Sequence, residues 1–178
     1  MKKILLLSIL GLLLMGCGQK ETDRSKLQER KGVYYEINQT KEFIGIVIEK
    51  YPNGQIKLKQ IIKNGKFNGP GESYYSNGQI KDKQNFKDGK MDGPWEQYYE
   101  NGKLKSKQTI KKGKIDGPLE YHYENGQIQS IITFKEGKMD GPSEYYYENG
   151  KIKIKGTFKN DQREGPWEFY DENGVLIR

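Results

Sequence analysis

The chain has 178 residues, with 31 Lys and Arg against 24 Asp and Glu, one His, one Cys, 22 Gly and 13 Tyr, and it contains no alanine. A single Cys excludes an intramolecular disulfide framework and a cysteine-rich zinc site, and a single His argues against a His-clustered metal site. Abundant Gly and Tyr without alanine predict strands joined by tight turns rather than helices. The net charge of +7 is too mild to predict a nucleic-acid partner.

Residues 1–16 have the pattern of a secretory signal. A short basic start precedes the apolar stretch Ile4–Met15, which is too short to span a bilayer, because a spanning helix needs about 20 residues. The residues Leu14-Met15-Gly16-Cys17 resemble the lipobox of bacterial lipoproteins. This resemblance implies lipidation of Cys17, export from the cytoplasm and lipid anchoring to a membrane of the bacterial cell envelope. An ordinary signal peptide or an uncleaved anchor is the alternative.

Three further segments follow the signal. Residues 17–32 are polar and of mixed charge, which predicts a lipid-anchored flexible tether. Residues 33–50 are expected to form degenerate capping strands, with Gly45–Ile48 covering the leading edge of the domain that follows. Residues 51–178 are expected to form a repeat array.

The array repeats every 24 residues. Asn-Gly pairs recur in this step from Asn53 to Asn173, and Gly-Pro pairs recur in the same step from Gly69 to Gly165. A fixed period of this length predicts a repeat architecture, and Asn-Gly between alternating apolar residues predicts a type I′ hairpin with positive φ at both central residues. The predicted structural turns are Asn53, Gly54, Asn77, Gly78, Asn101, Gly102, Asn125, Gly126, Asn149, Gly150, Asn173 and Gly174.

Alternation of apolar and polar residues on both sides of each turn predicts half-buried antiparallel strands. Around Asn101-Gly102, we expect Tyr98 opposite Lys105 and Glu96 opposite Lys107. The predicted fold is all-β: an elongated, twisted meander of β-hairpins. Curvature of the sheet, its own aromatic side chains or a partner must cover the apolar face, and a homodimer is one such arrangement.

The recurring string Gly93–Lys105 (GPWEQYYENGKLK) resembles the MORN-variant repeat, and the resemblance extends over residues 51–178. Bacterial chains of this kind are often described as antitoxin components of toxin–antitoxin systems, and related MORN repeats are associated with membrane or protein contacts. The resemblance brings no catalytic residues and no cofactor.

Two outward rows are the candidate surfaces of the array. The first row has one glutamate in each unit: Glu72, Glu96, Glu120, Glu144 and Glu168. Its expected cross-strand neighbours are Lys83, Lys107 and Lys155, which favours exposed ion pairs over catalytic carboxylates because catalytic sites are singular. Tyr and Lys side chains on the same face either shield the sheet or contact a ligand. The candidate binding face consists of Tyr74, Tyr98, His122, Tyr146, Tyr170, Lys81, Lys105 and Lys153.

The leading hypothesis is a non-enzymatic, membrane-anchored repeat module that binds an unknown protein partner at the cell envelope, as an immunity or antitoxin-like protein. The alternative is a binder of an envelope component, such as peptidoglycan, a polyanion or phospholipid headgroups, through the Tyr/Lys face. An enzyme would require a non-repeated polar cluster in one unit, and the sequence indicates none. No metal, cofactor or nucleic acid is expected.

Overall fold

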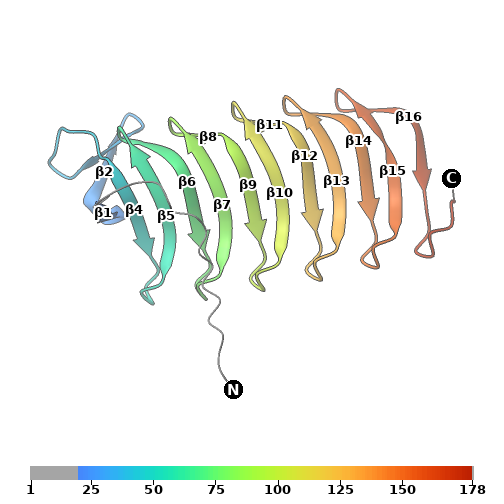
Figure 1. Cartoon of the computed structure of the whole chain (residues 1–178), viewed down its shortest axis with the longest axis horizontal. Helices are drawn as coiled ribbons and strands as arrows, with labels where there is room; N and C mark the ends of the chain where they lie inside the picture. Colours follow the sequence, from blue (N-terminus) through green and yellow to red (C-terminus); the bar gives the residue numbers. More distant parts are fainter. Residues whose placement is uncertain (1–19, 178) are drawn as a thin grey trace, which may run out of the picture.

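In the computed structural model, which describes residues 20–177, fourteen strands form one long sheet and a two-stranded hairpin lies at its N-terminal end (Figure 1). Neighbouring strands are antiparallel except for β1 and β4, so the predicted all-β meander of hairpins is confirmed. The strands are β1 (Glu21–Asp23), β2 (Leu27–Arg30), β3 (Val33–Glu36), β4 (Gly45–Lys50), β5 (Ile56–Lys63), β6 (Lys66–Tyr74), β7 (Ile80–Lys87), β8 (Lys90–Met91), β9 (Gly93–Tyr98), β10 (Leu104–Lys111), β11 (Lys114–Ile115), β12 (Gly117–His122), β13 (Ile128–Lys135), β14 (Lys138–Tyr146), β15 (Ile152–Lys159) and β16 (Gln162–Phe169).

The Asn-Gly turns lie along one long edge of the sheet, and they are not the type I′ turns that the sequence predicts. Gly102 has a φ of 81°, whereas Asn101 is not among the residues with positive φ. The Gly102 N–H donates to the Tyr99 carbonyl, and the Tyr99 N–H donates to the Lys103 carbonyl. This pattern is a three-residue loop in which a type I turn is followed by a left-handed glycine and a bulge.

The longer loop changes the strand register beside the turn. Tyr98 lies opposite Leu104 rather than Lys105, and the register shifts between Leu104 and Ser106. Beyond this bulge the predicted pairing of Glu96 with Lys107 is confirmed. The extra loop residue and the bulge compensate each other, which is why the sequence predicts the middle of the strands correctly and their ends incorrectly.

Type I′ turns occupy the opposite edge of the sheet. Lys112 and Gly113 have φ values of 51° and 78°, and Lys111 lies directly opposite Lys114. The sequence predicts a longer, glycine-rich connection here, over residues 111–118. Both central residues nevertheless adopt the left-handed conformation that a two-residue hairpin loop requires.

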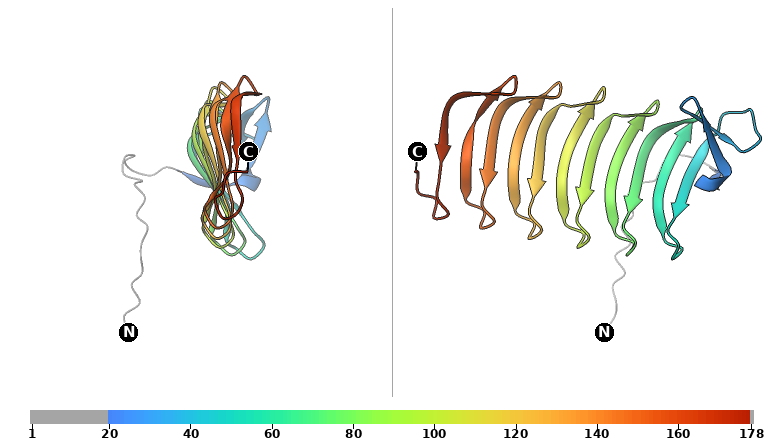
Figure 2. Two further views of the ribbon diagram at one scale, coloured as in Figure 1. Left: turned by 90° about the vertical axis from the view of Figure 1, so that its right-hand side faces the viewer. Right: turned by 180° about the vertical axis from the view of Figure 1, so that it is seen from behind.

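The strands are bent, so that the sheet forms an open trough when seen along its length (Figure 2). We call the hollow side the inner face; it carries Ser106 and Ser143, which are each 1% exposed, and Leu119, which is 5% exposed. Small residues here lie beside large ones: a Cβ on Gly156 would lie 2.3 Å from the Trp167 ring. Curvature and the sheet's own side chains therefore bury part of this face, while Tyr121 on the same face is 38% exposed.

A compact hydrophobic cluster covers the N-terminal end of the trough. The β2–β3 hairpin lies on the hollow side (Figure 2), where Tyr34 and Phe43 pack with Val47 and Ile62. Within residues 33–50, β3 belongs to this cap, whereas β4 pairs with β5 as the first hairpin of the array and has β1 along its other edge. The Gly65 N–H also donates to the Phe43 carbonyl at 2.9 Å, which joins this cap to the first repeat.

The predicted flexible tether over residues 17–32 is wrong for its described part. Residues 21–23 form β1, in which Thr22 pairs with Val47 in parallel and is only 6% exposed. The Arg24 guanidinium lies 4.3 Å from the centre of the Tyr34 ring and donates to its hydroxyl at 3.1 Å. Backbone pairing at an open strand edge orders this polar segment, although its side chains could not form a core alone. The predicted signal segment 1–16 and Cys17 lie outside the described residues.

Candidate functional site

A tyrosine ladder joins each repeat to the next. The Tyr99 hydroxyl donates to the His122 carbonyl at 2.6 Å, and Tyr75 donates to the Tyr98 carbonyl at 2.8 Å. The same bond recurs from Tyr51, Tyr123 and Tyr147, always to the carbonyl 23 residues later. Because the partner is in the following repeat, each phenol fixes the distance between two hairpins.

The Asn side chains of the Asn-Gly turns form a second ladder. In the five turns from Asn53 to Asn149, the carboxamide oxygen accepts from the backbone N–H two residues on, as Asn101 does from Lys103 at 2.9 Å. Each amide group donates to a carbonyl of the next turn, as Asn149 does to Glu172 at 2.9 Å. Asn is therefore required at this position for its carboxamide and not for a positive φ.

These ladders hold the outer face, which is the convex side of the trough. Its central row alternates in charge across the strands, with Lys83 opposite both Glu72 and Glu96. The pattern continues with Lys107 and Glu120 and is interrupted by Ile131. The predicted cross-strand Glu–Lys neighbours are confirmed, and such alternating pairs make a solvated face without an excess of either sign of charge.

Next to this row stands the predicted Tyr row. The Tyr98 hydroxyl donates to Glu96 at 2.7 Å, and Tyr74, Tyr146 and Tyr170 donate in the same way to the Glu two residues earlier. Burial and the hydrogen bond to Glu144 raise the pKa of Tyr146 to about 12. Burial and Glu96 likewise raise the pKa of Tyr98 above its ordinary value, because an ionised phenol would be desolvated beside a carboxylate.

The lysines of the predicted binding face lie over tyrosines other than those predicted to form that face with them. Lys81, Lys105 and Lys153 lie over the rings of the ladder tyrosines, with Lys153 Nζ 5.3 Å from the Tyr147 centroid. Lys83 and Lys155 instead lie over Tyr98 and Tyr170, the outward row. The bulge beside each Asn-Gly turn causes this exchange, because it moves the ladder tyrosines to the side of the bulged lysine.

His122 occupies one Tyr position in the outward row. Its Nε2 lies 3.7 Å from Glu120 Oε2 and has no hydrogen-bond partner, although its side chain is only 13% exposed. His122 thus lies beside the Glu two residues earlier, as the tyrosines of this row do, and its Nδ1 is 3.4 Å from the Gly126 carbonyl.

The inner face contains a polar cluster that the sequence analysis missed. Asp82 is 8% exposed and accepts hydrogen bonds from Ser73 at 2.7 Å, from Gln97 at 3.0 Å and from Trp95 at 3.4 Å. Ser106 extends the chain by donating to Gln97 at 3.0 Å. The expectation that no unit carries a non-repeated polar cluster is therefore wrong.

The Asp82 cluster nevertheless lacks the parts of a catalytic site. Its carboxylate is held by three donors, and within residues 20–177 no group of three or more His, Cys, Asp or Glu side chains is arranged to hold a metal ion. Ser and Gln at this spacing give no acid–base pair. The cluster is therefore a buried network of polar side chains that are hydrogen-bonded to one another.

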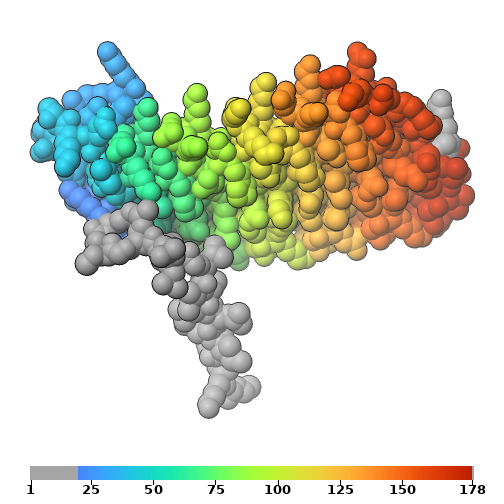
Figure 3. Space-filling model, turned by 45° about the horizontal axis from the view of Figure 1, so that its top comes forward, coloured from blue at the N-terminus to red at the C-terminus, as the bar shows by residue number. Residues whose placement is uncertain are grey.

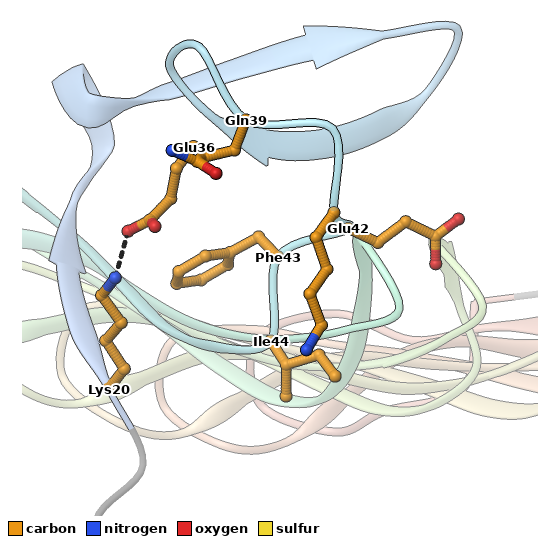
Figure 4. A pocket seen from close by; sticks show the side chains of 7 residues that line it. Lys20, Glu36, Gln39, Glu42, Phe43 and Ile44 are labelled. Carbon is orange, nitrogen blue, oxygen red and sulfur yellow. Dashed lines mark ion pairs between the residues drawn. The ribbon is translucent and has the colours of Figure 1, made fainter.

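A small pocket lies at the capped end, beside the first residue that the structure describes (Figure 4). Its volume is about 280 Å³, and its walls include Phe43 and an ion pair between Lys20 and Glu36 at 2.5 Å. Charges of both signs surround it, so it offers no pronounced preference for an anion or a cation.

In the part of the chain that the structure covers, no helix is long and apolar enough to cross a bilayer.

Comparisons with solved structures give only distant similarity. The chain is similar to a crystal structure of a S. aureus TarM mutant bound to fondaparinux, α-GlcNAc-glycerol and UDP, with 9% identity and a TM-score of 0.37 over 60% of this chain. A second crystal structure of TarM shows 12% identity and a TM-score of 0.35 over 59% of this chain. The aligned part is 21% of the length of each TarM chain. No curated protein matches the chain.

The match to a repeat family covers most of the chain. The MORN repeat variant matches residues 44–64, 67–88, 91–112, 115–136, 139–160 and 163–178, and the MORN repeat matches residues 155–166. Each complete match contains one hairpin closed by an Asn-Gly turn, as residues 91–112 contain β9 and β10. The chain therefore belongs to the MORN repeat variant family.

Proposed function

We propose that this protein is a non-enzymatic, lipid-anchored repeat module that binds a protein partner at the cell envelope, in the manner of an immunity or antitoxin-like protein. The observation that carries the proposal is the outer face, where a row of tyrosines is held in place by hydrogen bonds to glutamates and by the two inter-repeat ladders. Tyrosines fixed in this way offer large contact area and lose little conformational entropy on binding.

A protein partner fits this face better than a polyanion does. The lysines of the outer face already lie over tyrosine rings or opposite glutamates, as Lys83 lies over Tyr98 and opposite Glu96. Alternating charges and aromatic rings provide a patterned surface for another protein, while they leave little excess positive charge to attract a polymer of negative charge.

The membrane anchor in this proposal rests on Cys17 and its resemblance to a lipobox. Mass spectrometry of the mature protein tests it directly: we expect an N-terminal Cys17 that carries diacylglycerol. A Cys17→Ser variant should leave the membrane fraction. An unmodified chain that remains in the cytosol would refute the anchor and leave the proposal for the repeats standing.

Partner binding is tested by affinity capture from cells that express the full-length chain. The comparison strain carries Tyr74→Ala, Tyr98→Ala, Tyr146→Ala and Tyr170→Ala. We expect one abundant protein to be captured with the parent chain and not with the chain of the comparison strain. Expression of that captured protein alone then tests whether it is toxic. If capture is unchanged by the four substitutions in a folded variant, the outer face is not the binding surface.

A further inference from the structure

The type I′ turns form a row of positive charge along one long edge of the sheet. We define this lysine edge as residues 63–66, 87–90, 111–114, 135–138 and 159–162. These segments contain ten lysines, three acidic residues and no arginine, a formal charge of +7. The turns at the opposite edge (51–55, 75–79, 99–103, 123–127, 147–151 and 171–175) contain two lysines and five acidic residues, a formal charge of −3.

The lysines of this edge face one another in pairs. Lys63 lies opposite Lys66, Lys87 opposite Lys90, Lys111 opposite Lys114 and Lys135 opposite Lys138. Like charges directly opposite in a sheet are destabilising. An arrangement that costs stability and recurs at four consecutive turns is not explained by folding, and it contrasts with the alternating charges of the outer face.

The lysine edge is exposed and regularly spaced. Every lysine in it except Lys63 is exposed, and side chains project at intervals from this edge (Figure 3). Since strands lie about 4.8 Å apart, the row from β5 to β15 extends over roughly 40 Å with a lysine at each strand. Hydrogen bonds from Gly89 to the Phe67 carbonyl and from Gly137 to the Ile115 carbonyl, both 2.8 Å, hold successive turns together.

Two adjoining depressions lie between successive turns. Their volumes are about 390 and 320 Å³, and Lys114 and Glu136 line both of them. Ion pairs at 3.0 Å engage Lys111 with Asp116 and Lys159 with Asp140, which still leaves most of the positive charge along the row without an acidic partner among the described residues.

We propose that the lysine edge binds a linear polymer that carries phosphate groups along its length. An extended chain matches the straight row, and its repeated charges would relieve the repulsion between opposing lysines. Lysine acts as a compact point charge that contacts phosphate from any direction, whereas the fork of arginine, absent from this edge, suits planar bidentate recognition. This site is separate from the outer face of the proposed function, so either proposal can fail without the other.

Inorganic polyphosphate is the probe for the test. Binding to the full-length protein in a neutral detergent is measured over a series of salt concentrations for three chains. The edge variant carries Lys87→Gln, Lys90→Gln, Lys111→Gln and Lys114→Gln. The matched control carries Lys81→Gln, Lys83→Gln, Lys105→Gln and Lys107→Gln on the outer face, which changes the net charge by the same amount.

We expect the edge variant to bind at least about tenfold more weakly, with a slope of log K against log salt smaller by about 3, because each lysine–phosphate contact releases close to one counterion. The control should stay within about threefold of the parent chain. Thermal stability of the edge variant should be unchanged or higher, since repulsion is removed.

Equal weakening in both variants would overturn the proposal, because net charge alone would then explain the binding. Equal affinity for polyglutamate or for vesicles of anionic phospholipid would also overturn it, since the edge would then not select a phosphate polymer. A clear loss of thermal stability in the edge variant would show that the lysines serve the fold, and would contradict the argument from repulsion.

Discussion

At the scale of single residues, the Asn-Gly pair shows how a correct prediction can rest on an incomplete reason. The sequence predicts a turn at Asn101-Gly102, and a turn is there, but only the glycine has a positive φ. The Asn side chain instead bonds to Lys103 of its own turn and to Glu124 of the next. A single repeat does not contain this second partner, so local turn chemistry could not reveal it.

The tyrosine ladder predicts unequal effects of two neighbouring substitutions. Tyr99→Phe removes a hydrogen bond to the His122 carbonyl of the next repeat and should lower the free energy of unfolding by about 1 kcal/mol. Tyr98→Phe removes only a contact with the half-buried Glu96 on the same strand, so a smaller loss is expected. Denaturant unfolding of both variants measures the difference, and an equal loss would remove the basis for treating Tyr99 as a link between repeats.

The outward tyrosines predict a loss of stability in alkali. The folded pKa values of Tyr74, Tyr98 and Tyr146 lie above the ordinary value of about 10, and that of Tyr146 is about 12. A group whose folded pKa is raised contributes stability that is complete below the unfolded pKa and disappears as the pH rises through the folded pKa. Stability should therefore fall between about pH 10 and pH 12.

Phenolate absorbance, followed together with unfolding, tests this expectation. Tyr74, Tyr98 and Tyr146 should ionise above about pH 10, and Glu144→Gln should lower the pKa of Tyr146 in part, because burial is the larger cause of its shift. Ionisation of all tyrosines in one step near pH 10, with no loss of structure, would contradict it.

At the scale of strands, the last repeat shows how the inner face accommodates a large side chain. Trp167 lies against Gly156, packs edge-on against Phe158 at 4.9 Å and is covered by Arg163 at 4.5 Å. The sequence indicates the apolar character of this repeat, but it cannot show that a glycine on one strand makes room for a tryptophan on the next.

Gly156→Ala should therefore be destabilising by about 1–3 kcal/mol, because its Cβ would overlap the Trp167 ring. The same substitution in a Trp167→Leu chain should cost much less, since the obstructing ring is absent. Unfolding free energies of the two single variants and the double variant give the coupling between the sites. Additive effects would show that Gly156 is required for its backbone and not for the space beside it.

The N-terminal segment is the element that the sequence describes least well. Composition predicts no core for residues 17–32. In the described part of this segment, backbone pairing with β4 and the contact of Arg24 with Tyr34 order the chain, and Leu27 packs against the hydrophobic cluster of the cap. Arg24→Ala should weaken the cap by about 1 kcal/mol and speed proteolysis after Lys20 or Lys26, with little effect on the Asn-Gly turns. Proteolysis at unchanged rates would show that the cap does not depend on this contact.

At the scale of the whole molecule, the repeat made most of the fold predictable. The 24-residue period determines the number of hairpins, and the pairing of Glu96 with Lys107 follows from alternation. The bend of the sheet and the Asp82 cluster are not contained in one period. Ser73 lies opposite Asp82 and Gln97 lies opposite Ser106 in the same register that the alternation predicts. Asp82 and Gln97 are neighbours only because β7 also pairs with β9, which joins two hairpins.

The separation of charge between the two long edges is also a property of the whole sheet. In the sequence, lysines of the lysine edge alternate with those of the outer face, and the two groups are separated only when the strands are placed side by side. The molecule consequently presents three distinct surfaces: a patterned outer face, a partly buried inner face and one positively charged edge.

Site-specific photo-crosslinking in cells is the measurement that tests the proposed function most directly. A photoreactive amino acid is placed in the full-length chain at Tyr98 on the outer face, at Tyr121 on the inner face or at Lys112 on the lysine edge. We predict one discrete protein adduct from position 98, with none at the other two positions. The same adduct from Tyr121 or Lys112 but not from Tyr98, or no protein adduct from Tyr98 in a folded chain, would contradict the proposal that the outer face binds a protein partner.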